Sequence, residues 1–100
     1  MMVRITLKNA ETKVASLVLD TEKEVMKSVE IVPGKEVMAK LYFPKIEQNP
    51  TYSNFEALFK AYINDKTETK LVNYLKILAD GDTTFKTKAK RNLIMDVERI

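Results

Sequence analysis

Strict alternation of apolar and polar residues at the beginning of the chain is the feature that most limits the folds open to it. Val3, Ile5 and Leu7 alternate with polar neighbours, which is typical of a β-strand with one buried face. The alternation resumes over 13–20, where both faces are largely apolar, as in a strand that lies inside a sheet. Because only a short polar turn at 9–12 separates the two segments, the sequence predicts a β-hairpin.

Residues 22–31 fit two structures. A helix is indicated by the capping-box pattern of 21–24, in which Thr and Glu side chains satisfy free amides at a helix start. A strand is indicated by the apolar residues that follow, which nearly alternate, and by the pair Pro33-Gly34, which suits a type II turn. We predict the strand and keep the helix as the alternative.

A further strand is predicted over 37–43, because Val37, Ala39 and Leu41 occupy every second position before Pro44 ends the segment. This strand and the one at 22–31 are then expected to pair as a second hairpin. The predicted β-rich half of the chain therefore covers 2–43.

Residues 44–52 contain two of the three prolines and are predicted to connect the sheet to a helical half, 53–100. The first helix, 53–64, begins with a capping-box pattern and carries an apolar stripe rich in aromatic residues. The second, 67–79, begins with the same pattern, and Gly81 is placed to adopt the left-handed conformation that ends many helices.

A third helix is predicted over 83–98, where apolar residues recur four positions apart from Phe85 to Val97. The fold expected from these elements is a single α+β domain over 1–100, with an N-terminal antiparallel sheet of two β-hairpins, about four strands, packed against three C-terminal helices. If 22–31 were helical, the sheet would have one strand fewer and the class would be the same.

The residues that most enzymes use are missing from this sequence. It has no His and no Cys, so His-assisted nucleophiles and His or Cys metal ligands are excluded. Its two glycines cannot form a glycine-rich phosphate loop. The close carboxylates Asp80 and Asp82 lack further oxygen ligands and fit helix caps better than a cation site. We therefore expect a non-enzymatic protein with no catalytic residue, no cofactor and no metal site.

Apolar residues never run together for the roughly 18 positions that a membrane span needs. The first residues also lack the apolar stretch of a secretory signal peptide. The absence of cysteine is compatible with a reducing compartment. We expect a cytoplasmic protein that does not associate with membranes.

Positive charge is concentrated near the end of the chain, since the formal net charge of +3 arises entirely from 83–100. Such a cluster attracts anions, and neighbouring threonines can add phosphate contacts. On the predicted helix, however, the charges are spread around the exposed side and form no single row. These residues are the candidate contacts to nucleic acid or another anion: Lys86, Lys88, Lys90 and Arg91.

A second set of candidates consists of apolar and aromatic residues that fall outside the predicted core patterns. They are expected to be partly exposed beside lysines, as at the centre of a protein interface. The two that follow Leu93 would give the last helix a second apolar side, which a partner or a second copy would cover. The set is Met38, Tyr42, Ile46, Tyr52, Ile94 and Met95.

The function expected from these observations is a small protein-interaction, assembly or adaptor module that binds a protein partner or itself. The alternative is an accessory protein that contacts nucleic-acid phosphates through the basic residues near the end of the chain.

Overall fold

The computed structural model describes residues 1–63, 69–81 and 92–100. Within these residues it contains four strands and three helices, which confirms the predicted α+β class. In chain order they are β1 (Met2–Asn9), β2 (Thr12–Asp20), β3 (Val25–Ile31), α1 (Glu36–Tyr42), α2 (Tyr52–Tyr62), α3 (Leu71–Ala79) and β4 (Leu93–Arg99).

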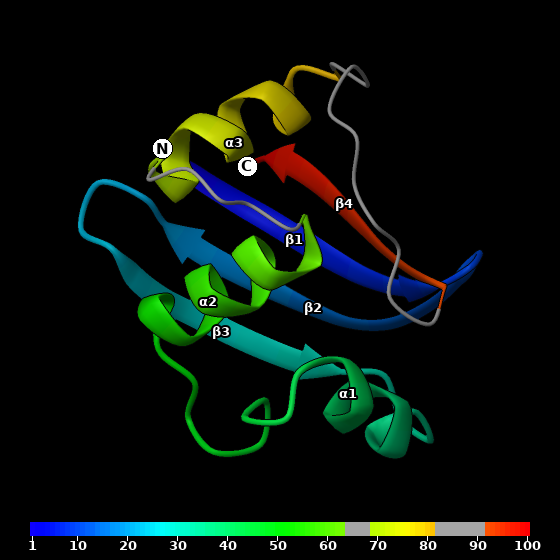
Figure 1. Ribbon diagram of the computed structural model, residues 1–100. Helices are drawn as coiled ribbons and strands as arrows, with labels where there is room; N and C mark the ends of the chain where they lie inside the picture. Colours follow the sequence, from blue (N-terminus) through cyan, green and yellow to red (C-terminus); the bar gives the residue numbers. More distant parts are fainter. Residues whose placement is uncertain (64–68, 82–91) are drawn as a thin grey trace.

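The four strands form one antiparallel sheet in the order β3-β2-β1-β4 (Figure 1). The last element of the chain therefore pairs with the first, and the amide of Ile100 donates a 3.2 Å hydrogen bond to the carbonyl of Met2. Among the described elements, β3 and β4 are the edges of the sheet.

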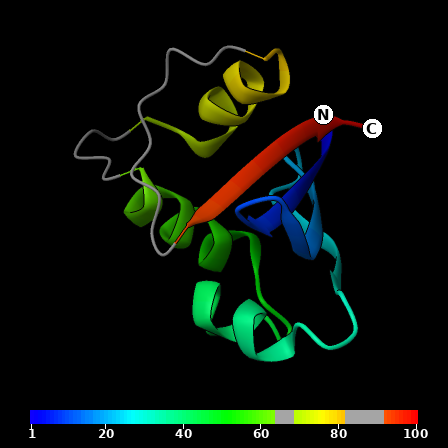
Figure 2. The same ribbon diagram turned by 90° about the vertical axis from the view of Figure 1, so that its right-hand side faces the viewer.

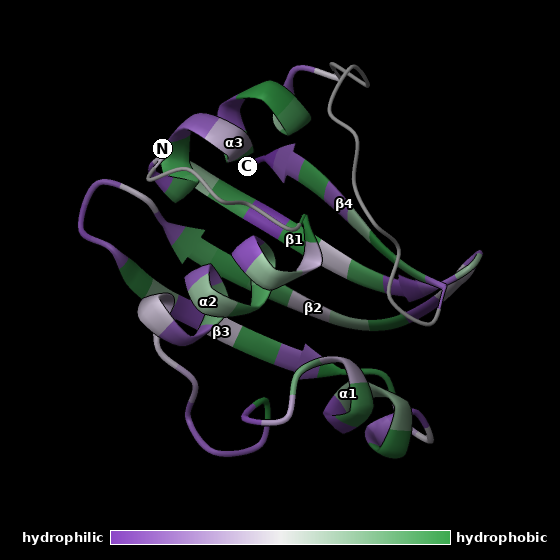
Figure 3. Ribbon diagram, in the orientation of Figure 1, coloured by the Kyte–Doolittle hydropathy of each residue, from purple (hydrophilic) through white to green (hydrophobic). Residues whose placement is uncertain are grey.

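All three helices lie on the same face of the sheet, and none of them covers the opposite face (Figure 2). Apolar and polar residues alternate along the strands (Figure 3), so one face packs against the helices. The opposite face carries two cross-strand ion pairs, Arg4 with Glu98 at 3.1 Å and Lys8 with Asp96 at 3.2 Å.

Aromatic rings from the helices fill the space above the sheet. Phe59 is central, with its ring centre 6.1 Å from that of Phe55 and 5.7 Å from that of Tyr74. The hydroxyl of Tyr62 donates a 3.1 Å hydrogen bond to the carbonyl of Leu93, which ties α2 to the start of β4. Burial of these rings against the strands is the main source of stability in such a two-layer fold.

Several predicted elements are confirmed. The first hairpin is β1 and β2, and residues 22–31 contain a strand, β3, as predicted. The predicted type II turn follows it, since the amide of Lys35 donates to the carbonyl of Val32 at 2.9 Å and Gly34 has a φ of 85°. Gly81, with a φ of 78°, adopts the predicted left-handed conformation after α3.

The strand predicted over 37–43 is wrong, because α1 occupies Glu36–Tyr42. Ala39 and Tyr42 are buried three positions apart, whereas Val37 is 82% exposed. That burial pattern has the helical period, and two of the three apolar residues that suggested a strand, Val37 and Leu41, are exposed on the helix. The predicted pairing of 22–31 with 37–43 therefore does not occur, and β3 instead forms the second hairpin with β2.

The helix predicted over 83–98 is wrong from Leu93 onward, where the chain forms β4. Leu93 and Met95 are buried and the intervening Ile94 is exposed, which is the alternation of a strand. The part of the prediction that covers 83–91 lies outside the described residues. The division into a β-rich half, 2–43, and a helical half, 53–100, consequently misplaces α1 and β4.

The other two predicted helices exist with shifted starts. Helix α2 is capped by Thr51, whose hydroxyl accepts a 3.1 Å hydrogen bond from the amide of Asn54, while the Asn54 side chain accepts a 2.9 Å bond from the amide of Thr51. This reciprocal box lies two residues before the predicted one. Helix α3 begins at Leu71, and the predicted start at 67 lies outside the described residues.

Candidate protein-interaction groove

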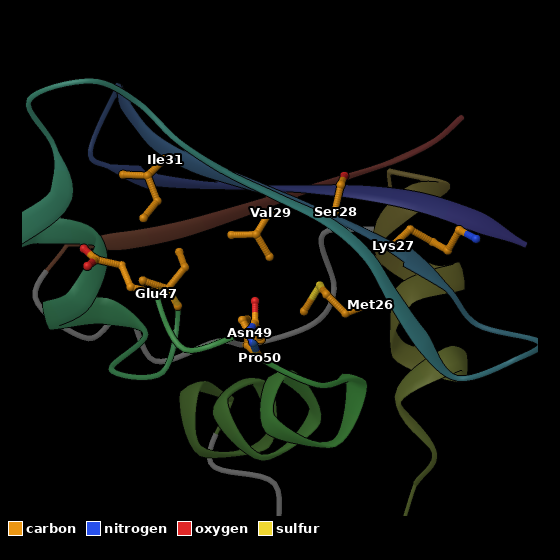
Figure 4. Close-up of a pocket in the computed structure, with 9 residues that line it drawn as sticks. Met26, Lys27, Ser28, Val29, Ile31, Glu47, Asn49 and Pro50 are labelled. Atoms are coloured by element: carbon orange, nitrogen blue, oxygen red, sulfur yellow. The ribbon is translucent and has the colours of Figure 1, made fainter.

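A groove of about 580 Å³ runs along the edge strand β3 (Figure 4). One side is β3 itself, and the other is the connector between α1 and α2. The residues that line it are Met26, Lys27, Ser28, Val29, Ile31, Ile46, Glu47, Asn49 and Pro50. The groove thus joins a sheet edge to an irregular segment that lies beside the helical layer.

The side chains of β3 are divided between the two faces of the sheet. Met26 and Val29 point toward the connector, whereas Ser28 points away from it (Figure 4). Met26, Val29 and Ile31 are partly buried and pack against the core. They give the groove an apolar surface that belongs to the same face as the rest of the core.

A bulge interrupts β3 at Lys27. Val18 pairs with Ser28, and the next residue of β2, Leu19, pairs with Met26, so Lys27 is the extra residue. Bulges and lysines are both common at sheet edges, where they oppose unwanted pairing between sheets. Lys27 is exposed and forms no ion pair with any described residue.

The connector side of the groove is held by its own hydrogen bonds. The amide of Ile46 donates to the carbonyl of Phe43, and that of Gln48 donates to the carbonyl of Lys45, each at 2.9 Å. Ile46 and Pro50 are buried, so they anchor this segment to the core. The connector is therefore a folded turn that presents Ile46 and Pro50 to the groove.

The backbone of β3 has groups available on its outer edge. The amide of Val32 donates to the carbonyl of Val14 at 2.9 Å, so this pair is hydrogen-bonded. Hydrogen-bonded pairs occur at every second residue of an antiparallel ladder, so the backbone groups of Glu30 and Ser28 are the next ones of β3 to bond to β2. The amides and carbonyls of Val29 and Ile31 then point away from β2, toward the groove.

Charge differs between the two ends of the groove. Lys27 lies at the Met26 end, and Glu47 lies at the Ile31 end (Figure 4). The carboxylate of Glu47 is 3.8 Å from the ammonium group of Lys40, which partly neutralises it. Lys27 has no such ion pair with a described residue.

The predicted interface residues do not form one exposed surface. Tyr42, Ile46, Tyr52 and Met95 are buried, and Met38 is partly buried against the core. Ile94 is exposed on the face of the sheet that the helices leave uncovered. Ile46 is the one member of the set that lines the groove.

Burial changes the chemistry of one residue of this set. It raises the pKa of the Tyr52 phenol to about 12, and the carboxylates of Glu24 and Glu56 add to the effect. Tyr52 thus stays neutral well above neutral pH, as expected for a core residue.

The four predicted anion contacts, Lys86, Lys88, Lys90 and Arg91, lie outside the described residues. Sequence reasoning did not identify Met26, Val29 and Asn49 as groove residues. The available signal was the break that Lys27 and Ser28 make in the alternation of β3. It marked an irregular strand without showing which sheet edge that strand occupies.

No group of three or more acidic residues is arranged to hold a metal ion in 1–63, 69–81 and 92–100. No helix in these same ranges is long and apolar enough to cross a bilayer. Comparison of the chain with protein-family models, with curated proteins and with solved structures found no match.

Proposed function

We propose that this chain is a small non-enzymatic protein-interaction module that binds its partner in the groove beside β3. The observation that carries the proposal is the combination of an edge strand with a groove of mixed polar and apolar lining along it. Proteins normally protect the edges of their sheets, because unpaired amides and carbonyls attract other chains. Here the edge lies beside an apolar surface made by Val29, Ile31 and Ile46.

The size of the groove supports binding. Ligand sites in proteins are typically clefts of about 300–1,000 Å³. The groove beside β3, at about 580 Å³, falls within that range. Its polar groups are the outer backbone of β3 and the side chains of Lys27, Ser28, Glu47 and Asn49.

The experiment compares two substitutions on the same strand. Val29→Glu places a carboxylate in the groove, whereas Val25→Glu places one at an exposed position of β3 that does not line it. A partner recovered with the wild-type chain is identified, purified and titrated against each protein by calorimetry. We expect Val29→Glu to weaken binding by about tenfold or more and Val25→Glu to change it little.

Thermal unfolding of both variants shows that they are folded at the temperature of the titration. Lys27→Glu provides a second groove variant whose change is confined to an exposed side chain. Equal binding by all of these proteins would contradict the proposal, as would the lack of any partner. Light scattering on the purified chain tests the alternative that the partner is a second copy.

Contact with nucleic acid is the second candidate function. It is favoured by the sequence alone, in which Lys86, Lys88, Lys90 and Arg91 occur within six residues that contain no acid. Phosphate contacts of this kind weaken steeply with salt. Replacement of all four by Gln is expected to reduce both the affinity for an oligonucleotide and its salt dependence, and the absence of binding at low salt would exclude this function.

A further inference from the structure

We infer that the groove beside β3 takes an extended peptide segment of a partner protein, which adds to the sheet as a fifth strand and places an acidic side chain at Lys27. This inference rests on the proposed function and specifies its ligand. The ligand is an apolar, alternating segment in the β conformation, with the acid at the end that lies over Met26.

The outer backbone of β3 favours an extended ligand. The amides and carbonyls of Val29 and Ile31 point into the groove, and no described backbone group is hydrogen-bonded to them. A strand that adds to a sheet edge binds through such groups, while its alternate side chains enter pockets beside the edge. A helical ligand uses its backbone hydrogen bonds internally and would leave the edge of β3 unpaired.

The dimensions of the groove suit one short strand. Its lining on β3 runs from Met26 to Ile31, which is roughly 17–20 Å at the rise of a β-strand. Every second side chain of an added strand would face the helical layer, where Ile46 and Pro50 lie. Met26, Val29 and Ile31 are only partly buried on this face, which favours apolar side chains at alternate positions of the ligand.

Charge distinguishes a peptide ligand from a second copy of the chain. A two-fold pairing of β3 with its own copy, centred on Ser28, would bring the two Lys27 ammonium groups close together. Like charges at such positions are unfavourable. An acidic side chain at this place would instead meet a lysine that forms no ion pair with any residue of the described ranges.

The test uses synthetic peptides and the full chain. The probes are fluorescein-labelled heptapeptides of alternating valine and threonine, acetylated and amidated. One peptide carries a glutamate at its first position and another carries it at its last position. Matched peptides carry lysine in place of the glutamate. Fluorescence anisotropy gives their affinities. We expect one glutamate peptide to bind about tenfold more tightly than its lysine counterpart, and Lys27→Glu to reverse this preference.

A second arm tests strand addition through the backbone. N-methylation of the peptide amides that face β3 is expected to weaken binding about tenfold, whereas N-methylation of the alternate amides has little effect. On the protein, Val29→Pro removes an outward amide without removing a bond to β2, and Val29→Ala keeps that amide as the matched control. Circular dichroism shows whether these variants are folded, and the peptide experiment needs no variant at all.

Three results of the peptide experiments would overturn the inference. They are the absence of binding by every peptide, equal affinities of the glutamate and lysine peptides, and an affinity that N-methylation of neither set of peptide amides changes. If the partner from the experiment above still depended on Val29 while every peptide failed, strand addition would be wrong and the interaction function would stand. A dimer that Lys27→Glu strengthens would identify a second copy as the occupant and would likewise contradict the inference.

Discussion

Two neighbouring residues of β4 test the C-terminal strand directly. Met95 is 8% exposed and pairs with Leu7, on the face that the helices cover. Ile94 is 39% exposed and pairs with Lys8, on the opposite face. Truncation of each to alanine therefore removes a core side chain in one case and a surface side chain in the other.

The expected magnitudes follow from this difference in burial. Replacement of a buried Met by Ala typically costs about 2–5 kcal/mol, and an edge strand, which relaxes more readily, places Met95→Ala near the lower end. Truncation of a surface residue of a strand costs about 1 kcal/mol or less. For a domain of this size, 1 kcal/mol lowers the melting temperature by about 4–8 °C. We therefore expect a decrease of roughly 10–20 °C for Met95→Ala and of about 5 °C for Ile94→Ala.

Thermal unfolding followed by circular dichroism measures both values, and urea unfolding gives the matching free energies. The two variants serve as controls for each other, because they lie in the same strand one position apart. On a helix whose buried face is formed by Leu93 and Val97, Ile94 would flank that face and Met95 would lie on the opposite side, so Ile94→Ala would have the larger effect. Equal destabilisation by the two substitutions, or a larger effect at Ile94, would refute the strand and its register.

Two further predictions concern the beginning of α2. Thr51→Ala removes the helix cap that Asn54 completes and should lower the free energy of unfolding by about 1 kcal/mol. Ser53→Ala, inside the helix, should change the free energy of unfolding little. Equal losses for the two variants in urea unfolding would contradict this capping box. The Tyr52 phenol, whose pKa rises from 10.0 to about 12 mainly through burial, loses its proton more readily in the unfolded chain. The stability that the neutral phenol contributes is therefore complete below pH 10 and declines as the pH rises toward 12. Urea unfolding near pH 9 and near pH 11 measures this decline, which Tyr52→Phe should lack. An identical loss of stability in both proteins would contradict the raised pKa.

The elements that were predicted correctly carry more than one local signal. The first hairpin combines clear alternation with a polar turn, and β3 is followed by Pro33-Gly34, which fixes the turn type. Helix α2 has a stripe of aromatic residues that only a helical period brings to one face. In these segments, local preference and tertiary packing favour the same structure.

The two incorrect predictions share a physical cause. Leu93 and Val97 are four positions apart, as are Val37 and Leu41, and a spacing of four places residues on one face of both a helix and a strand. The burial of the residue midway between them distinguishes a helix from a strand. Met95 is buried with Leu93, which makes β4 a strand, whereas Val37 and Leu41 are exposed and Ala39 is buried, which makes α1 a helix. That burial depends on packing with distant segments and cannot be found from local spacing.

The candidate groove depends on the same tertiary information. A strand at 37–43 that paired with β3 would have placed β3 inside the sheet and covered its outer amides. Because those residues form α1, β3 remains an edge, and the chain turns back through the connector so that Ile46 and Pro50 lie beside it. Among the described strands, β4 lies beside β1 at the opposite edge of the sheet. The position of the groove is therefore a consequence of strand order, and the local pattern of β3 supplies only its lysine, its bulge and its apolar face.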